Sequence, residues 1–140
     1  MITLLDDANL NGHAQVLDNR LRGEPWREFR DYLDIRFVFL EDLGLTHRTK
    51  DHIIWRLCQE RGFYLLTANR NNDGDDSLEA TIRREGTISS LPVLTIADAN
   101  GILSSPAYLG AVTNSLLDYL LYEETFRGTG RLFLPTKWPK

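Results

Sequence analysis

The segment ITLLDD at residues 2–7 decides the fold class, because a short, mostly apolar run leads directly into two acids. Such a run, followed by turn-forming residues, predicts a buried β-strand. The pattern recurs at residues 35–42, 63–69 and 91–98, where each apolar run ends at an acid or a carboxamide. Apolar residues at helical spacing separate these runs. Continuous apolar strands that alternate with helices are typical of a parallel sheet covered on both faces. We therefore expect an α/β protein, a three-layer α/β/α sandwich with a central parallel sheet.

The helices predicted between these strands follow from spacing and capping signals. We expect them at about residues 14–21, 26–33, 49–61, 76–85 and 105–121. Thr49 is the expected N-cap of the third helix and Gly62 its stop. Its expected inward face consists of Ile53, Ile54, Leu57 and Cys58.

Capping and turn signals also predict the elements in the C-terminal half of the chain. Residues 76–79 fit a capping box that begins at Asp76. Asn100-Gly101 predicts a turn, and Ser105-Pro106 predicts an N-cap followed by Pro at the first helical position. Residues 131–134 are expected to form an edge strand. We expect one domain over residues 1–134 and a C-terminal tail over residues 135–140.

Composition excludes several classes of protein. The 140 residues are 42% hydrophobic and 26% charged, as expected for one globular domain rather than a disordered chain. The formal net charge of −4 argues against a protein that coats nucleic acid by bulk electrostatics. The single cysteine, Cys58, excludes an intramolecular disulfide and a Cys-rich zinc site. Without an apolar run of spanning length or a signal-peptide pattern, the chain is expected to be cytoplasmic.

Oxygen-bearing side chains follow every predicted strand. In an open parallel sheet, ligands bind at the carboxyl ends of the strands. The residues expected there are Asp6, Glu41, Asp42, Asn69 and Asp98, with Asp51 in the first turn of a helix that starts at the same edge. Such a set, without cysteine or paired histidine, favours Mg²⁺ or Mn²⁺. The same acids could instead serve only as helix caps and turn residues.

Four segments, in order, resemble the short bacterial proteins of the PIN-like superfamily. They are Leu4-Leu5-Asp6-Asp7-Ala8-Asn9, the Leu-Gly-Leu turn at 43–45, Asp51-His52-Ile53-Ile54-Trp55, and Gly62-Phe63-Tyr64-Leu65-Leu66-Thr67-Ala68-Asn69. Proteins of that family have a first strand ending in Asp-Glu-Asn, a helix opening with Asp and a strand ending in Thr-x-Asp. The resemblance covers about residues 1–98. It implies an acidic cluster that binds Mg²⁺ or Mn²⁺, and a ribonuclease, in some cases the toxin of a toxin–antitoxin module.

Transferred residue by residue, the resemblance implies a site with one departure from the family pattern. Asp6 matches the first acid, Asp51 the second, and Asn69 stands where the third acid belongs. Asp7 replaces the Glu of the first motif, and Asp73 can supply the missing charge, as can Asp75 or Asp76. The predicted catalytic residues are therefore Asp6, Asp51, Asn69 and Asp73, the predicted metal ligands are these four with Asp7, and the predicted substrate contacts are Arg70 and Thr67.

Alternatives to a metal-dependent endoribonuclease remain open. The Asn69 departure is compatible with a weak or inactive PIN-like module that binds RNA or an antitoxin-like protein, and a homodimer is possible in either case. Arg20, Arg22, Arg27 and Arg30 form a basic group, although neighbouring acids can pair with them. A phosphoacceptor receiver domain is disfavoured, because no lysine lies between Lys50 and Lys137.

Overall fold

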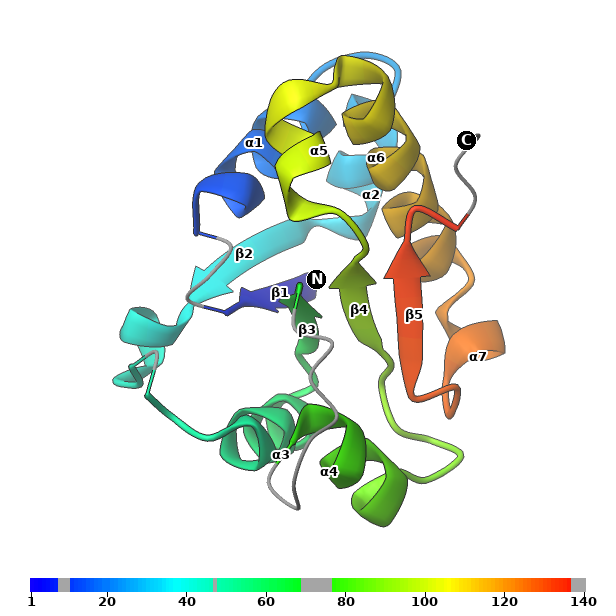
Figure 1. Cartoon of the computed structure of the whole chain (residues 1–140). Coiled ribbons are helices and arrows are strands. Elements are labelled where there is room, and N and C mark those ends of the chain that lie inside the picture. Colours follow the sequence, from blue (N-terminus) through cyan, green and yellow to red (C-terminus); the bar gives the residue numbers. More distant parts are fainter. Residues whose placement is uncertain (8–10, 47, 69–76, 137–140) are drawn as a thin grey trace.

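The computed structural model describes residues 1–7, 11–46, 48–68 and 77–136 of the chain. Within them, five parallel strands form one sheet in the order β2-β1-β3-β4-β5 (Figure 1). The strands are β1 (Ile2–Asp6), β2 (Ile35–Phe39), β3 (Tyr64–Thr67), β4 (Val93–Ile96) and β5 (Arg131–Leu134). The register places Asp6 beside Phe39 of β2 and beside Leu66 of β3. The predicted α/β class and parallel sheet are confirmed, as is the edge strand at residues 131–134.

Helices cover both faces of this sheet (Figure 1). One face carries α1 (Asn11–Leu21), α2 (Arg27–Leu33), α5 (Ala99–Ser104) and α6 (Pro106–Leu121). The opposite face carries α3 (Asp51–Arg61) and α4 (Leu78–Glu85). The 3-10 helix η2 (Leu40–Leu43) follows β2, and the short α7 (Glu123–Phe126) precedes β5. The predicted three-layer arrangement is therefore present.

Alternate side chains of each strand pack into two separate hydrophobic cores, one on each face of the sheet. Leu4 packs with residues of α1 and α6, whereas the next residue, Leu5, packs with Trp55 and Cys58 of α3. Successive strand side chains point to opposite faces. A run of consecutive apolar residues therefore serves both cores, which is why the strands read as continuous apolar segments.

Several predicted boundaries are wrong by a residue or more. Lys50, not Thr49, occupies the N-cap of α3, because the Thr49 hydroxyl instead accepts a hydrogen bond from the Thr46 N–H at 3.2 Å. Ile53 is 45% exposed, whereas Trp55 is buried, so the inward face of α3 is rotated relative to the expected one. Gly62 does end α3, with a left-handed φ of 71°.

Two expectations in the second half also need correction. The N-cap of α4 is Ser77, whose hydroxyl accepts from the Ala80 N–H at 3.1 Å, and Asp76 lies outside the described residues. Asn100-Gly101 lies inside α5 rather than in a turn. Gly101 packs so closely on Tyr108 that a Cβ would lie 2.7 Å from the ring, so this glycine serves packing. Residues 137–140 of the predicted tail also lie outside the described part.

No helix within the described residues has both the length and the apolar character that a membrane span requires.

Candidate functional site

The carboxyl end of β1 lies at the point where the chain changes direction across the sheet. The connection from β1 to β2 runs through α1 and α2 on one face, and that from β2 to β3 runs through α3 on the other. The neighbouring strands β1 and β3 therefore diverge at a topological switch point, where doubly wound proteins bind ligands. Asp6 ends β1 and Thr67 ends β3, so both predicted residues are placed at this point.

Asp6 is the most unusual residue at this edge. Its side chain is fully buried, and neither carboxylate oxygen has a hydrogen-bond partner among the described residues. Burial, and after it the negative charges of Asp7 and Glu41, together raise the pKa of Asp6 from 3.8 to about 8. Buried polar groups are almost always paired, and strongly shifted carboxyl groups gather at functional sites. Asp6 is therefore a carboxylate that a bound cation would compensate.

Hydrogen bonds of Asp7 and Thr67 link the ends of β1 and β3, just past the last paired residues of these two strands. The Asp7 N–H donates to the Leu66 carbonyl at 3.2 Å, and the Thr67 hydroxyl donates to the Asp7 carboxylate. Thr67 itself is fully buried. The structure thus shows this residue positioning Asp7, and a contact between Thr67 and substrate stays a prediction.

The acids after β2 have different surroundings. Glu41 is exposed in η2, and its charge acts on Asp6. Asp42 caps η2, accepting from the Phe39 N–H at 2.9 Å. The sequence pattern predicts both acids at this edge but does not include Glu41 among the metal ligands. The feature that distinguishes Glu41 is its position, because it comes two residues after Phe39, which is the register partner of Asp6.

The remaining predicted site residues are not all brought together. Asp51 opens α3 and is half-buried, and among the described acids it is the charges of Asp7 and Glu41, not that of Asp51, that raise the pKa of Asp6. Within the described residues, no three His, Cys, Asp or Glu side chains are grouped closely enough to hold a metal ion. Asn69, Arg70 and Asp73 lie outside the described residues.

Two other candidates have structural roles. Asp98 is the N-cap of α5, where its carboxylate accepts from the Gly101 N–H at 3.3 Å. Cys58 is buried, and burial raises the pKa of its thiol to about 12, which makes it an inert core residue at neutral pH.

The donor set tests whether a divalent cation fits this edge. Mg²⁺ is commonly held by one or two carboxylates, with water and substrate phosphate completing the coordination. Asp6 and the adjacent Asp7 supply carboxylates of this kind. The Asp6 oxygens accept no hydrogen bond from the described part of the chain, and Glu41 adds negative charge. These residues fit a hard cation.

No protein-family model, curated protein or solved structure that was compared with this chain matches it.

Proposed function

We propose that this chain is a PIN-like, metal-dependent phosphodiesterase that hydrolyses RNA. The proposal is supported mainly by Asp6, a buried carboxylate at the switch point whose oxygens lack partners among the described residues. Maintaining such a group costs folding free energy, and proteins keep groups of this kind mainly at functional sites. RNA is proposed as the substrate because the sequence motifs, in their order along the chain, resemble those of PIN-like proteins.

In this proposal, Asp6 and Asp7 hold Mg²⁺ or Mn²⁺, and Asp51, Asn69 and Asp73 complete the set of oxygen ligands. When bound, the cation would lower the pKa of a coordinated water and stabilise negative charge on the phosphodiester. Asp6 contributes a ligand that is shielded from bulk water, and Thr67 fixes the orientation of Asp7 through its hydroxyl. Arg70 is proposed to contact a substrate phosphate.

Calorimetric titration of the metal-free protein with Mn²⁺ and Mg²⁺ tests the proposal, with the wild type compared with Asp6→Asn. We expect binding by the wild type and none by the variant, together with RNA cleavage that depends on the cation and on Asp6. Asp98→Asn is the matched control, because it removes a carboxylate that only caps α5. Absence of binding at millimolar cation, or cleavage that survives in Asp6→Asn, would overturn the proposal.

A second candidate is a PIN-like module with weak or no catalysis that binds RNA or an antitoxin-like protein. Asn69 favours it, because a neutral carboxamide in place of the third acid lowers the charge available to a hard cation. Replacement Asn69→Asp discriminates the two candidates. A nuclease already supplied with charge by Asp73 gains little from it, whereas a module weakened by the lost acid gains cation affinity and activity.

A phosphoacceptor receiver is not supported. The strand order is shared among doubly wound proteins with different functions, so it does not decide between them. A receiver needs an acceptor aspartate at the end of the middle strand. Here β3 ends at Thr67 and is followed by Ala68.

A further inference from the structure

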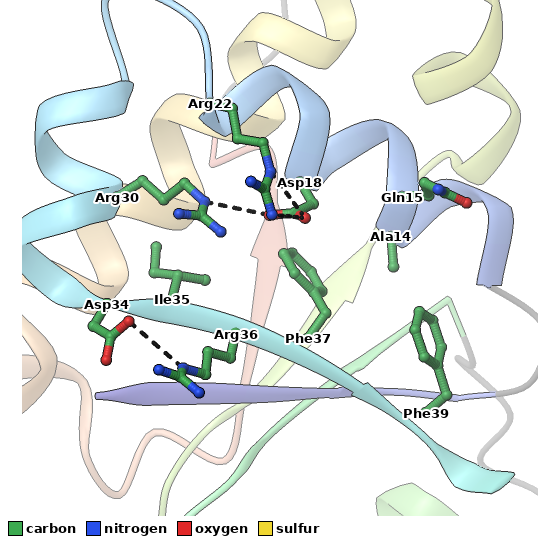
Figure 2. A pocket seen from close by; sticks show the side chains of 10 residues that line it. All are labelled: Ala14, Gln15, Asp18, Arg22, Arg30, Asp34, Ile35, Arg36, Phe37 and Phe39. Atoms are coloured by element: carbon green, nitrogen blue, oxygen red, sulfur yellow. Dashed lines mark hydrogen bonds and ion pairs between the residues drawn. The ribbon is translucent and has the colours of Figure 1, made fainter. Parts of the chain in front are cut away.

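A groove of about 570 Å³ lies between α1, α2 and the edge strand β2 (Figure 2), and none of the acids described above lines it. This volume is within the range of sites that hold small molecules. Arg22, Arg30 and Arg36 line it together with Asp18 and Asp34, and Phe37 and Phe39 form part of its floor. The lining therefore combines cationic and aromatic side chains.

The carboxylate of Asp18 accepts hydrogen bonds from two of these arginines. Arg22 at the end of α1 donates to Asp18 Oδ2 at 3.1 and 3.3 Å, and Arg30 of α2 donates through Nε to Asp18 Oδ1 at 3.3 Å. Figure 2 shows both guanidinium groups converging on Asp18 from different helices. The terminal nitrogens of Arg30 donate no hydrogen bond to any described residue, although Nη1 lies 3.6 Å from Asp31. Two guanidinium groups held together with N–H groups to spare form a site that suits phosphate.

Charge in the groove has the opposite sign to that of the chain. Three arginines face two aspartates there, whereas the whole chain carries −4. Arg30 is only 18% exposed, so its charge acts in surroundings that screen it less than bulk water does. The other arginines of the basic group are engaged elsewhere, since Arg20 stacks on Trp26 and Arg27 pairs with Glu24 at 2.8 Å.

The other end of the groove is aromatic and leads toward Asp6. Phe37 and Phe39 extend from β2 toward α1, with Gln15 above Phe39 (Figure 2). Phe39 is the register partner of Asp6, so this end of the groove lies at the carboxyl edge of the sheet. Aromatic side chains beside cationic ones are the combination that binds bases and phosphates of single-stranded nucleic acid.

We propose that this groove binds a nucleotide, with its phosphate at Arg22 and Arg30 and its base against Phe37 and Phe39. The nucleotide can be free, or it can belong to a single RNA strand. The second case rests on the proposed function, because the strand would then continue from Phe39 to Asp6. The first case is independent of any hydrolysis.

Binding of fluorescent UMP and of a fluorescent six-nucleotide oligouridylate, followed by anisotropy in EDTA, tests the proposal and separates the two sources. We expect Arg22→Gln and Arg30→Gln each to weaken binding about tenfold, and Phe39→Ala to weaken it similarly through lost stacking. Arg22 is 60% exposed, so Arg22→Gln should fold even if Arg30→Gln does not. Arg27→Gln is the matched control outside the groove and should bind as the wild type does.

Asp34→Asn gives a test of opposite sign. Asp34 has a left-handed φ of 51°, which asparagine also adopts readily, and the substitution removes one negative charge from the groove. Binding should tighten about threefold. Failure of UMP and of the oligonucleotide to bind, binding unaffected by the groove variants, or equal affinity for UMP, inorganic phosphate and polyglutamate would each overturn the proposal.

The outcome is separable from that of the proposed function. Asp6→Asn should bind UMP as well as the wild type does in EDTA, because Asp6 does not line the groove. If the wild type cleaves RNA with Mn²⁺ but binds neither probe through the groove, the groove proposal alone fails. If the groove variants weaken binding but no cation supports cleavage, the nuclease proposal alone fails.

Discussion

Asp6 should make the stability of the metal-free protein fall as pH rises. Its pKa is about 8 in the folded chain and near the ordinary 3.8 in the unfolded chain. Between these values the unfolded chain has released this proton and the folded chain retains it, so raising the pH favours unfolding. The loss from this group is about 1.4 kcal/mol per pH unit and levels off above pH 8.

Urea unfolding of the wild type and Asp6→Asn at pH 5, 6, 7 and 8 isolates this effect. The other titrating groups are common to both proteins, so the difference between their unfolding free energies should shift steadily in favour of the variant as pH rises. Parallel curves would mean that the carboxyl group of Asp6 is ionised normally in the fold.

Thr67 should be required for the orientation of Asp7. Replacement Thr67→Val keeps the shape of this fully buried side chain but removes the hydroxyl that donates to Asp7. A lost hydrogen bond to a charged group costs about 1.5–3 kcal/mol of stability, and cation affinity should fall with it. Thr67→Ser retains the hydroxyl and serves as the control in denaturation and cation titration. Equal cation affinity in Thr67→Val and the wild type would contradict the positioning role.

At the scale of elements, Gly62 and Gly110 have equal room for a side chain, but replacing each with alanine should change the stability of the protein in opposite directions. An added Cβ meets nothing within 4 Å at Gly62 or at Gly110. Gly110 lies inside α6, so Gly110→Ala should stabilise the protein by about 0.5–1 kcal/mol. Gly62 has a φ of 71°, so Gly62→Ala should destabilise it by about 1 kcal/mol. Thermal unfolding of both variants measures the difference, and shifts of the same sign would contradict the argument.

Strands and long helices could be predicted from the sequence because their signals are local. Residues 2–5 and 91–97 are mostly apolar, and Ser105-Pro106 caps α6 as expected. The short helix α5 could not be predicted, because Asn100-Gly101 has the sequence of a turn. Only the distant ring of Tyr108 explains why residue 101 must be glycine.

The candidate site could be predicted in part for the same reason. Asp6 and Thr67 were predicted from the strands that they end, and the structure places both at the switch point. The influence of Glu41 on Asp6 depends on the pairing of β1 with β2, which the sequence does not specify. That no residue of the described ranges pairs with the Asp6 oxygens is a result of three-dimensional packing, and no local pattern predicts it.

At the scale of the whole molecule, the edge strand β5 should be integral to the fold. Leu134 is fully buried in the core on the α6 side, whereas its neighbour Phe133 is 44% exposed. Leu134→Ala should cost about 2–5 kcal/mol through lost burial and the cavity left behind. Phe133→Ala should cost clearly less and is the matched control in urea unfolding. Equal losses would indicate that β5 packs only loosely.

A cation held at the end of β1 should stabilise the entire fold rather than one loop. A ligand that binds only the folded state at 100 times its dissociation constant adds about 2.7 kcal/mol to the unfolding free energy. The slowest-exchanging amides exchange through global unfolding, so their hydrogen exchange should slow about 100-fold with Mn²⁺. Strands β1, β3 and β4 meet at the centre of the sheet, and their amides should report this effect together. In Asp6→Asn the exchange should not respond to Mn²⁺, because the ligand that couples the cation to the core is gone. Protection confined to the surface near η2 would instead show that the cation binds exposed acids such as Glu41 without engaging Asp6.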